Sequence, residues 1–271
     1  MKTKRNQELT KQEEFVRDHR RHHHQVSAWR FIIFALFLAL WEISAALGWI
    51  DSFFFASPSR VVLCLMDQFR SNNMLTHIGI TLFETVVSFF LVILFSLLTA
   101  TLLWYSPKLS EILEPYLVVL NSLPKSALAP LFIVWLGTGA TTIIVAGISV
   151  AVFGSVISLY TGFQQVDAEK VTLIYTLGGR KRDAFFKVVL PGSLPVLLST
   201  AKVNIGLALV GVIIGEFLAA RRGLGYLIIY GSQVFRLDMV ITGIIVLCII
   251  ALVFYKSIQL MEHQIKKEFK M

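Results

Sequence analysis

Five ionisable side chains lie within or at the ends of long apolar runs: Glu42, Glu84, Lys125, Lys202 and Glu216. If such runs cross a bilayer, a charge at the centre costs about 2.5 to 3.5 kcal/mol, so each side chain must face protein, water or the interface. Residues of this kind bind charged solutes, relay protons or form internal ion pairs. They are the natural candidates for chemistry at membrane depth.

Lys125 lies in an apolar run that Pro124 and Pro130 interrupt. Irregular backbone at membrane depth is tolerated where it is buried in protein or lines a water-filled cavity. The pattern fits a solute pathway or gate, and it fits equally a structural kink buried between subunits. The pathway candidates of this stretch are Asn121, Ser122, Lys125 and Ser126.

Lys202, Asn204 and Glu216 are further pathway candidates in a later run. Lys202 and Glu216 are fourteen residues apart, which is about 21 Å along a helix, so they cannot pair directly. Arg221 and Arg222 follow Glu216, and an internal charge partnership that holds the outer loop is the favoured alternative for this glutamate. We expect Glu42 near the outer interface and Glu84 beside a polar group of another helix.

The composition places these residues in a membrane protein. Of the 271 residues, 56% are hydrophobic and 15% are charged, and the mean hydropathy is +0.72. About six runs approach the roughly 20 apolar residues that a membrane helix needs. We therefore predict an all-α, polytopic transmembrane bundle with spans at 29–49, 78–105, 112–136, 140–163, 196–220 and 239–257.

The basic residues indicate which loops are cytoplasmic. Residues 1–30 hold eight Lys and Arg, the 164–195 loop holds five, and the loops 50–77 and 221–238 hold two and three. The positive-inside rule then places both termini and the 164–195 loop in the cytoplasm. The predicted domains are a polar tail at 1–28, a membrane domain at 29–258 that includes the 164–195 loop, and a cytoplasmic tail at 259–271. The polar segment before the first apolar run is longer than the n-region of a signal peptide, so we expect this run to be a retained span. The chain is therefore expected to be a multi-pass protein of a prokaryotic cell membrane.

Other functional classes have little support. The net charge of +8 follows the ends of the spans, which indicates topology and not nucleic-acid binding. Cys64 and Cys248 have no metal-ligand spacing, and the run 22–24 of three histidines has no accompanying carboxylate or thiolate pattern. We expect no cofactor and no metal. No GxxxxGK[ST] loop is present, so we expect no ATPase or other enzyme activity in this chain.

The segment 166–195 is not a plain connector. Leu173 and Leu177, then Phe185, Val188 and Val189, recur at near-helical spacings. The pair Gly178-Gly179 predicts a helix end, and Pro191 and Pro195 predict a break before the next span. We expect two short helices joined by a tight turn, with exposed apolar ridges that mark an interface.

Here the residues resemble a known family. Gly178, nine residues, then Val188-x-Leu190-Pro191 is similar to the cytoplasmic signature loop of ABC importer permeases. The stretches 55–59, 121–131 and 215–228 resemble the permeases of nitrate, taurine and alkanesulfonate importers. Where the family carries Glu-Ala-Ala, this chain carries Thr172-Leu173-Ile174, which implies docking by packing more than by an acidic contact.

The resemblance implies a permease that pairs with a second copy of itself. Each copy would dock a cytoplasmic ABC ATPase, and an extracytoplasmic solute-binding protein would deliver a small anionic or zwitterionic solute. The implied ATPase-docking residues are Thr172, Leu173, Ile174, Leu177, Gly178, Gly179, Arg180, Phe185, Val188, Leu190 and Pro191.

Two other hypotheses stay open at this point. One is an ion-gradient-driven secondary carrier with Glu84 or Glu216 as a proton relay; the other is a membrane scaffold that recruits a partner through the same loop. The segment 223–235 is expected to be an outer amphipathic or re-entrant helix, which would contact the binding protein, close the outer mouth or simply lie at the interface.

Overall fold

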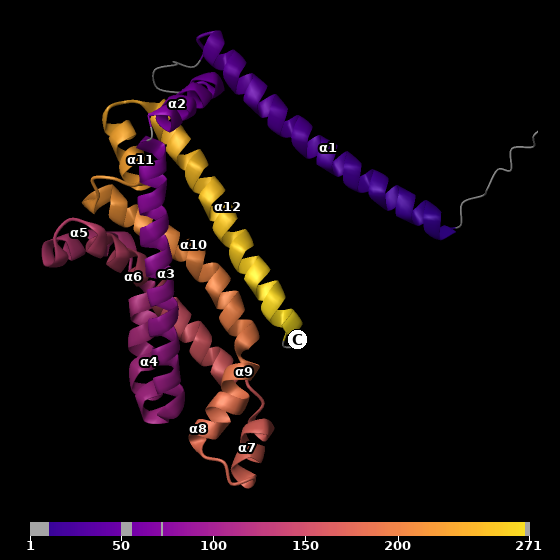
Figure 1. Cartoon of the computed structure of the whole chain (residues 1–271), viewed down its shortest axis with the longest axis vertical. Coiled ribbons are helices and arrows are strands. Elements are labelled where there is room, and N and C mark those ends of the chain that lie inside the picture. Colours follow the sequence, from indigo (N-terminus) through magenta and orange to yellow (C-terminus); the bar gives the residue numbers. More distant parts are fainter. Residues whose placement is uncertain (1–10, 50–55, 72, 269–271) are drawn as a thin grey trace, which may run out of the picture. The chain divides into compact units, whose positions relative to one another are not determined.

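The computed structural model describes residues 11–49, 56–71 and 73–268, and the regular structure of these ranges is helical (Figure 1). The chain divides into two compact units, residues 1–63 and 64–271. Each unit is described by itself. The helical architecture confirms the predicted fold class at this level.

The first unit contains α1 (Lys11–Ala46) and the start of α2 (Pro58–Arg70). The apolar part of α1, Trp29–Ala46, is long enough to cross a membrane, and the helix continues unbroken from the predicted polar tail. Glu42 accepts hydrogen bonds from the backbone N–H of Ser59 at 3.0 Å and from its hydroxyl at 2.7 Å. The carboxylate therefore caps the first turn of α2, which accounts for one of the charges in an apolar run.

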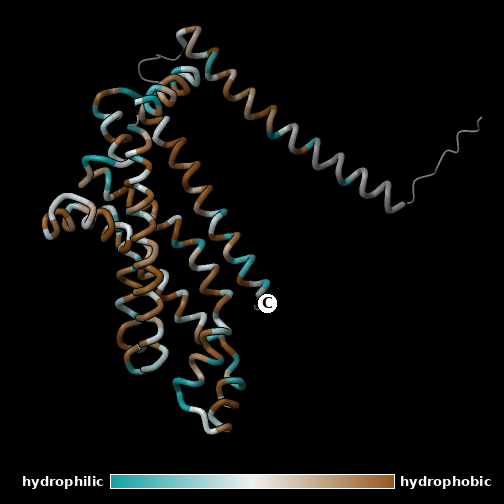
Figure 2. The backbone as a smooth tube through the Cα atoms, viewed as in Figure 1, coloured by the Kyte–Doolittle hydropathy of each residue, from teal (hydrophilic) through white to brown (hydrophobic). Residues whose placement is uncertain are grey.

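The second unit is built on four long helices: α3 (Asn73–Tyr105), α6 (Ala140–Gln164), α10 (Leu194–Ala219) and α12 (Leu237–Glu268). Each is apolar and long enough to span a membrane, and Figure 2 shows their hydrophobic lengths with hydrophilic residues gathered toward their ends. α6 packs against both α3 and α10. Since a Cβ atom on Gly211 would lie 2.8 Å from the Gly147 Cα, the α6 and α10 backbones approach closely.

The predicted span 112–136 is not a straight helix. α4 (Pro107–Ser122) and α5 (Lys125–Leu136) meet at an angle of 97° across Leu123 and Pro124. Proline at 124 supplies no N–H to continue the α4 ladder, and it begins α5 in an extended conformation. The described part of the chain thus has five helices that could cross a membrane, or up to six if this bent pair counts as one span.

Short helices lie at the two ends of this unit (Figure 1). At one end the chain forms α7 (Ala168–Thr176), α8 (Lys181–Ala184), the π-turn η1 (Phe185–Val189) and α9 (Leu190–Gly192). At the other end α11 (Leu224–Gln233) packs against α10 and α12. This arrangement agrees with the predicted alternation of the 164–195 and 221–238 loops between the two membrane faces.

Candidate docking elbow and intramembrane polar residues

The segment Ala168–Gly192, which we call the elbow, contains two short helical arms joined by a tight turn, as predicted. The Gly179 N–H donates to the Ile174 carbonyl at 2.9 Å, and the Gly178 N–H donates to the Tyr175 carbonyl at 3.0 Å. These two bonds, with φ of +82° at Gly178, form a Schellman helix end. Glycine is favoured at 178 because most other residues are strained at this φ.

The first arm of the elbow presents an apolar surface to solvent. Every side chain of α7 is at least partly exposed, and Leu173 and Leu177 are 56% and 76% exposed. The two leucines are four residues apart and therefore lie on one face of the helix. Thr172 is also exposed, and its hydroxyl donates to the Ala168 carbonyl at 2.8 Å. We call Leu173 and Leu177 with the adjoining Thr172 the α7 ridge.

The second arm of the elbow is anchored in the bundle through Phe185. This side chain is 2% exposed, and its ring lies 5.2 Å from Trp104, 5.6 Å from Tyr105 and 5.5 Å from Phe163, measured between centroids. Val189 is buried in the same cluster. The expectation that Phe185 and Val189 form an exposed docking ridge is therefore wrong: they face the ends of α3 and α6, because the second arm lies against those helices.

Lys181 forms a polar contact between the elbow and the end of α3, and this contact was not predicted from the sequence. Its ammonium group donates to the Tyr105 carbonyl at 3.0 Å and lies over the rings of Trp104 and Tyr105 at 5.5 and 5.9 Å from their centroids. Tyr105 is the last residue of α3, so a cation meets the negative end of that helix dipole. The sequence did contain a signal for this contact. Trp104 and Tyr105 end an apolar run, and the basic cluster 180–182 lies in a later loop.

The second arm continues toward α10 without the predicted break at Pro191. A π-turn precedes this proline, and the Leu190 N–H donates to the Phe185 carbonyl five residues back. Proline lacks an N–H and its ring would press on the carbonyl four residues earlier, so the wider turn relieves both problems. The chain turns only at Ser193, one residue before α10 begins.

Asp183 fixes the start of the second arm. Its carboxylate accepts from the Arg180 backbone N–H at 2.9 Å and lies 3.3 Å from the Lys187 ammonium. The backbone hydrogen bond, followed by the lysine, holds the pKa of Asp183 below its ordinary value of 3.8. Arg180, one of the implied docking residues, is exposed, whereas Val188, Leu190 and Pro191 are half-buried, and Leu190 packs against the Phe185 cluster.

Within the membrane unit, Lys125 lies at the bend between α4 and α5. Its ammonium group donates to the Asn121 carbonyl, and Ser122 donates its hydroxyl to the Val118 carbonyl at 2.9 Å. The lysine bond satisfies a carbonyl in the last turn of α4, where a cation is favoured. Ser126 is exposed on the first turn of α5, so the four candidates of this stretch gather at one bend.

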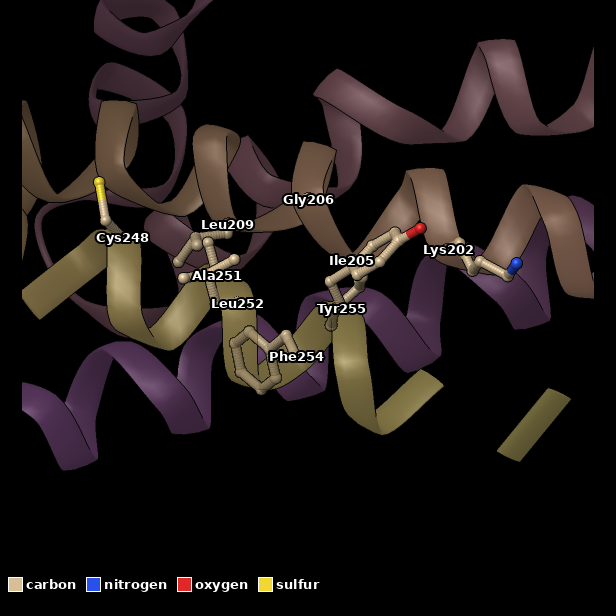
Figure 3. Close-up of a pocket in the computed structure, with 9 residues that line it drawn as sticks. All are labelled: Lys202, Ile205, Gly206, Leu209, Cys248, Ala251, Leu252, Phe254 and Tyr255. Carbon is tan, nitrogen blue, oxygen red and sulfur yellow. The ribbon is translucent and has the colours of Figure 1, made fainter. Parts of the chain in front are cut away.

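Lys202 forms an ion pair with Glu262, which joins α10 to α12. Beside it, a hollow of about 490 Å³ is lined by Lys202 and Tyr255 at one end and by apolar side chains such as Leu209 and Leu252. Figure 3 shows this hollow between the two helices, with the Lys202 amino group at its edge. The pairing favours a structural role for Lys202, and a role in the pathway stays a prediction.

Asn204 and Glu216 are buried within the unit. Asn204 donates its side-chain N–H to the Ser155 hydroxyl at 2.8 Å, which ties α10 to α6. Glu216 is fully buried and accepts from the Thr81 hydroxyl at 2.7 Å and from the Gly225 N–H at 2.5 Å. Both placements favour internal partnerships over solute contact, and the hydrogen-bond partners of Glu216 include a hydroxyl and a backbone N–H.

Residues 92–267 match the family of binding-protein-dependent transport system inner membrane components. This chain belongs to that family. It is therefore a multi-pass inner-membrane permease component of an ABC transporter, and ATP hydrolysis is carried out by a separate subunit. The family membership confirms the resemblance seen in the signature loop, and binding-protein dependence implies both an ATPase and a solute-binding protein as partners.

Individual relatives cover most of the permease. It is 26% identical over 86% of its length to the putative aliphatic sulfonates transport permease SsuC of Bacillus subtilis, of which 84% is covered. It is 28% identical over 72% of its length to the formylaminopyrimidine transport permease ThiX of Halalkalibacterium halodurans, of which 77% is covered. These two relatives are named for chemically different solutes.

The fold is similar to that of a solved transporter. A chain of the MetNI methionine ABC transporter, in an inward facing conformation, superposes with a TM-score of 0.64 and 19% identity, covering 70% of this permease and 95% of that chain. At this identity the likeness concerns the fold alone.

Proposed function

We propose that this permease docks a cytoplasmic ABC ATPase at the elbow and, with a second copy of itself, forms the pathway for a small anionic or zwitterionic solute. The observation that carries the docking proposal is the contrast between the two arms of the elbow. Leu173 and Leu177 are left in solvent, whereas Phe185 is buried in the bundle. An apolar surface held on a fixed base is what a partner protein binds.

The α7 ridge includes Thr172 and Leu173, two of the three residues that this chain carries in place of the family's Glu-Ala-Ala. With Thr172 in place of the acid, the side chain bonds to its own helix backbone and offers no charge to the partner. Leu173 and Leu177 supply apolar area instead, at about 25 cal/mol per Å² of surface removed from water. Docking in this permease is therefore governed by packing.

The second arm supplies the transmission of movement. Phe185 and Lys181 join the elbow to the last turn of α3, and Phe185 also reaches Phe163 on α6. A displacement of the docked ATPase would carry these helix ends with it as a rigid body. Closure of the two ATPase subunits would thus be converted into movement of the helices that surround the solute pathway.

The proposed orientation has the elbow and both chain termini on the cytoplasmic side. The basic residues at 1–30, in the 164–195 loop and after 256 support this orientation. The Lys181 bond to Tyr105 puts the turn between α3 and α4 on the same side as the elbow, and α11 lies at the opposite end (Figure 1).

A second copy is supported by the surface of α10. Val203, Gly206, Val210 and Phe217 are exposed at spacings of three, four and seven residues, which places them along one side of the helix. Small and apolar residues on one stripe suit close packing of membrane helices. The bend with Lys125 would then lie near the shared pathway and favour a solute with a negative charge.

The substrate class is inferred from the named relatives and from one lysine of the pathway stretch. Of the two relatives described, one is named for sulfonates and the other for a formylaminopyrimidine. A sulfonate or taurine-like solute agrees with a lysine at the α4–α5 bend, and the binding protein would make most of the selection.

The test is ATPase capture by Leu177 variants. Purified Leu177→Asp permease should lose the co-eluting ATPase and vanadate-sensitive uptake, because a charge is placed in an apolar contact. Leu177→Met, which keeps the apolar volume, should retain both. Retention of the ATPase by Leu177→Asp at the wild-type ratio would contradict docking at the α7 ridge. Uptake that continues on an ion gradient without the ATPase would instead support the secondary carrier.

A further inference from the structure

A complete helix cap is assembled from separate helices at the end of the bundle opposite the elbow. The first N–H groups of α11 have no partners within their own helix. The Gly223 N–H donates to His77 Nδ1 at 2.9 Å, the Leu224 N–H donates to the Thr81 hydroxyl at 2.9 Å, and the Gly225 N–H donates to Glu216 at 2.5 Å. α3 and α10 thus provide the side chains that α11 itself lacks.

Glu216 is the charged member of this cap. The Tyr226 N–H also donates to its carboxylate, so two consecutive N–H groups of α11 and the Thr81 hydroxyl converge on it. The backbone leaves space for the carboxylate. A Cβ on Gly225 would lie 2.7 Å from the Glu216 Cβ, and φ at Gly223 is +117°. The positive end of the α11 dipole stabilises an anion at this position.

Glu84 brings a second carboxyl group to the same place. It is 3% exposed on α3, one turn beyond Thr81. One of its oxygens forms a hydrogen bond with Glu216, and its Oε2 is buried with no hydrogen-bond partner among the described residues. An ionised carboxylate can only accept, so a hydrogen bond between two carboxyl groups requires a proton on one of them.

The geometry decides which carboxyl group holds the proton. Both oxygens of Glu216 already accept bonds from fixed donors, whereas Glu84 has no such donor on Oε2. Two adjacent buried anions would repel each other, and among the described residues the hydrogen-bond partners of Glu216 are Thr81, Gly225, Tyr226 and Glu84, none of which is a cation. Glu84 is therefore the donor and Glu216 the acceptor.

We propose that Glu84 and Glu216 hold one proton between them and that this singly charged pair is a latch which fastens α11 to α3 and α10. Glu216 is the anchor, since its anion caps α11. Glu84 is a positioning residue, since its proton holds the Glu216 carboxylate in place. The latch retains its proton and does not relay it, which distinguishes it from the proton relay of a secondary carrier.

The experiment compares Glu84→Gln with Glu216→Gln in the full chain in detergent. Glutamine at 84 still donates to Glu216, so its melting temperature should stay within about 2 °C of wild type. Glutamine at 216 offers one acceptor oxygen to the Thr81 hydroxyl, two backbone N–H groups and the Glu84 proton, so its melting temperature should fall by roughly 5 °C or more. Equal destabilisation by the two variants would overturn the proposal.

A second readout detects the proton itself. The infrared spectrum of the wild-type protein at neutral pH should contain the C=O band of a protonated carboxyl group, and Glu84→Gln should remove it. Glu216→Gln should shift the band without removing it. A wild-type spectrum without this band, or a band unchanged in Glu84→Gln, would overturn the shared proton. Both readouts are made on the folded permease, so they remain decisive if the proposed docking function fails.

Discussion

Phe185→Ala should separate docking of the ATPase from transmission of its movement. The ring is 2% exposed and contacts Trp104, Tyr105 and Phe163. Truncation of a buried phenylalanine costs about 3 to 5 kcal/mol, because transfer energy is lost and a cavity remains. Lys181 and the rest of the elbow are left in place, so we expect the second arm to loosen from the helices without loss of the α7 ridge.

The assay measures three quantities on the same purified variant. The melting temperature should fall, the ATPase should still co-elute, and uptake per hydrolysed ATP should fall roughly tenfold or more, as a loss of a few kcal/mol in the coupled state implies. Phe186→Ala is the matched control, since this neighbouring ring is 52% exposed and lies against the Phe185 ring and Arg182 without being buried in the bundle. It should cost less than about 1 kcal/mol and leave coupling intact.

Two outcomes would refute this reasoning. If Phe185→Ala and Phe186→Ala had equal effects on stability and uptake, burial of Phe185 would not anchor the elbow. If Phe185→Ala released the ATPase as Leu177→Asp does while leaving the melting temperature unchanged, Phe185 would belong to the docking surface.

Three further predictions concern other parts of the molecule. Lys202→Glu and Glu262→Lys should each destabilise the permease by about 3 kcal/mol or more. The double exchange should restore stability and uptake if the two residues act as a pair. A double exchange that is stable but inactive in uptake would support a solute role for the lysine. Gly178→Asn should keep ATPase capture and Gly178→Val should weaken it, since asparagine tolerates a φ of +82° and a β-branched residue does not. Equal capture by both variants would mean that capture of the ATPase does not require the Schellman turn. The lowered pKa of Asp183 means that its stabilisation of the elbow is present at all pH values above its ordinary 3.8 and is lost as the pH falls below that value. ATPase capture should therefore be insensitive to pH near neutrality, whereas Asp183→Asn should weaken capture. A loss of capture between pH 7 and 5 that Asp183→Asn abolishes would contradict this direction.

The prediction of spans from the sequence was accurate where the signal was long and apolar. The runs at 78–105, 140–163 and 239–257 lie within α3, α6 and α12, and the run at 196–220 matches α10 except for its last residue. The largest difference is in α12, which continues to Glu268. The run at 112–136 was recognised as interrupted, but its bend of 97° could not be predicted. A proline indicates where a helix is broken, and the direction of the next helix depends on what it packs against.

The elbow was predicted correctly in outline and wrongly in the direction of one arm. Leu173, Leu177, Phe185 and Val189 are all apolar residues at helical spacings. Two of them lie in solvent and two lie in the bundle. Periodicity identifies a face of a helix, and it carries no information on whether that face meets the same chain or a partner.

By itself the sequence determined that this protein is helical, crosses the membrane several times and carries a glycine turn in a basic loop. Those properties depend on local physics: the length of apolar runs, the placement of Lys and Arg, and the backbone freedom of Gly178. Only the tertiary structure decided the partners of the intramembrane charges. Lys202 meets Glu262, and Glu216 meets Thr81 from a helix 135 residues away. A buried charge must find a partner, but which one it finds depends on how the helices pack.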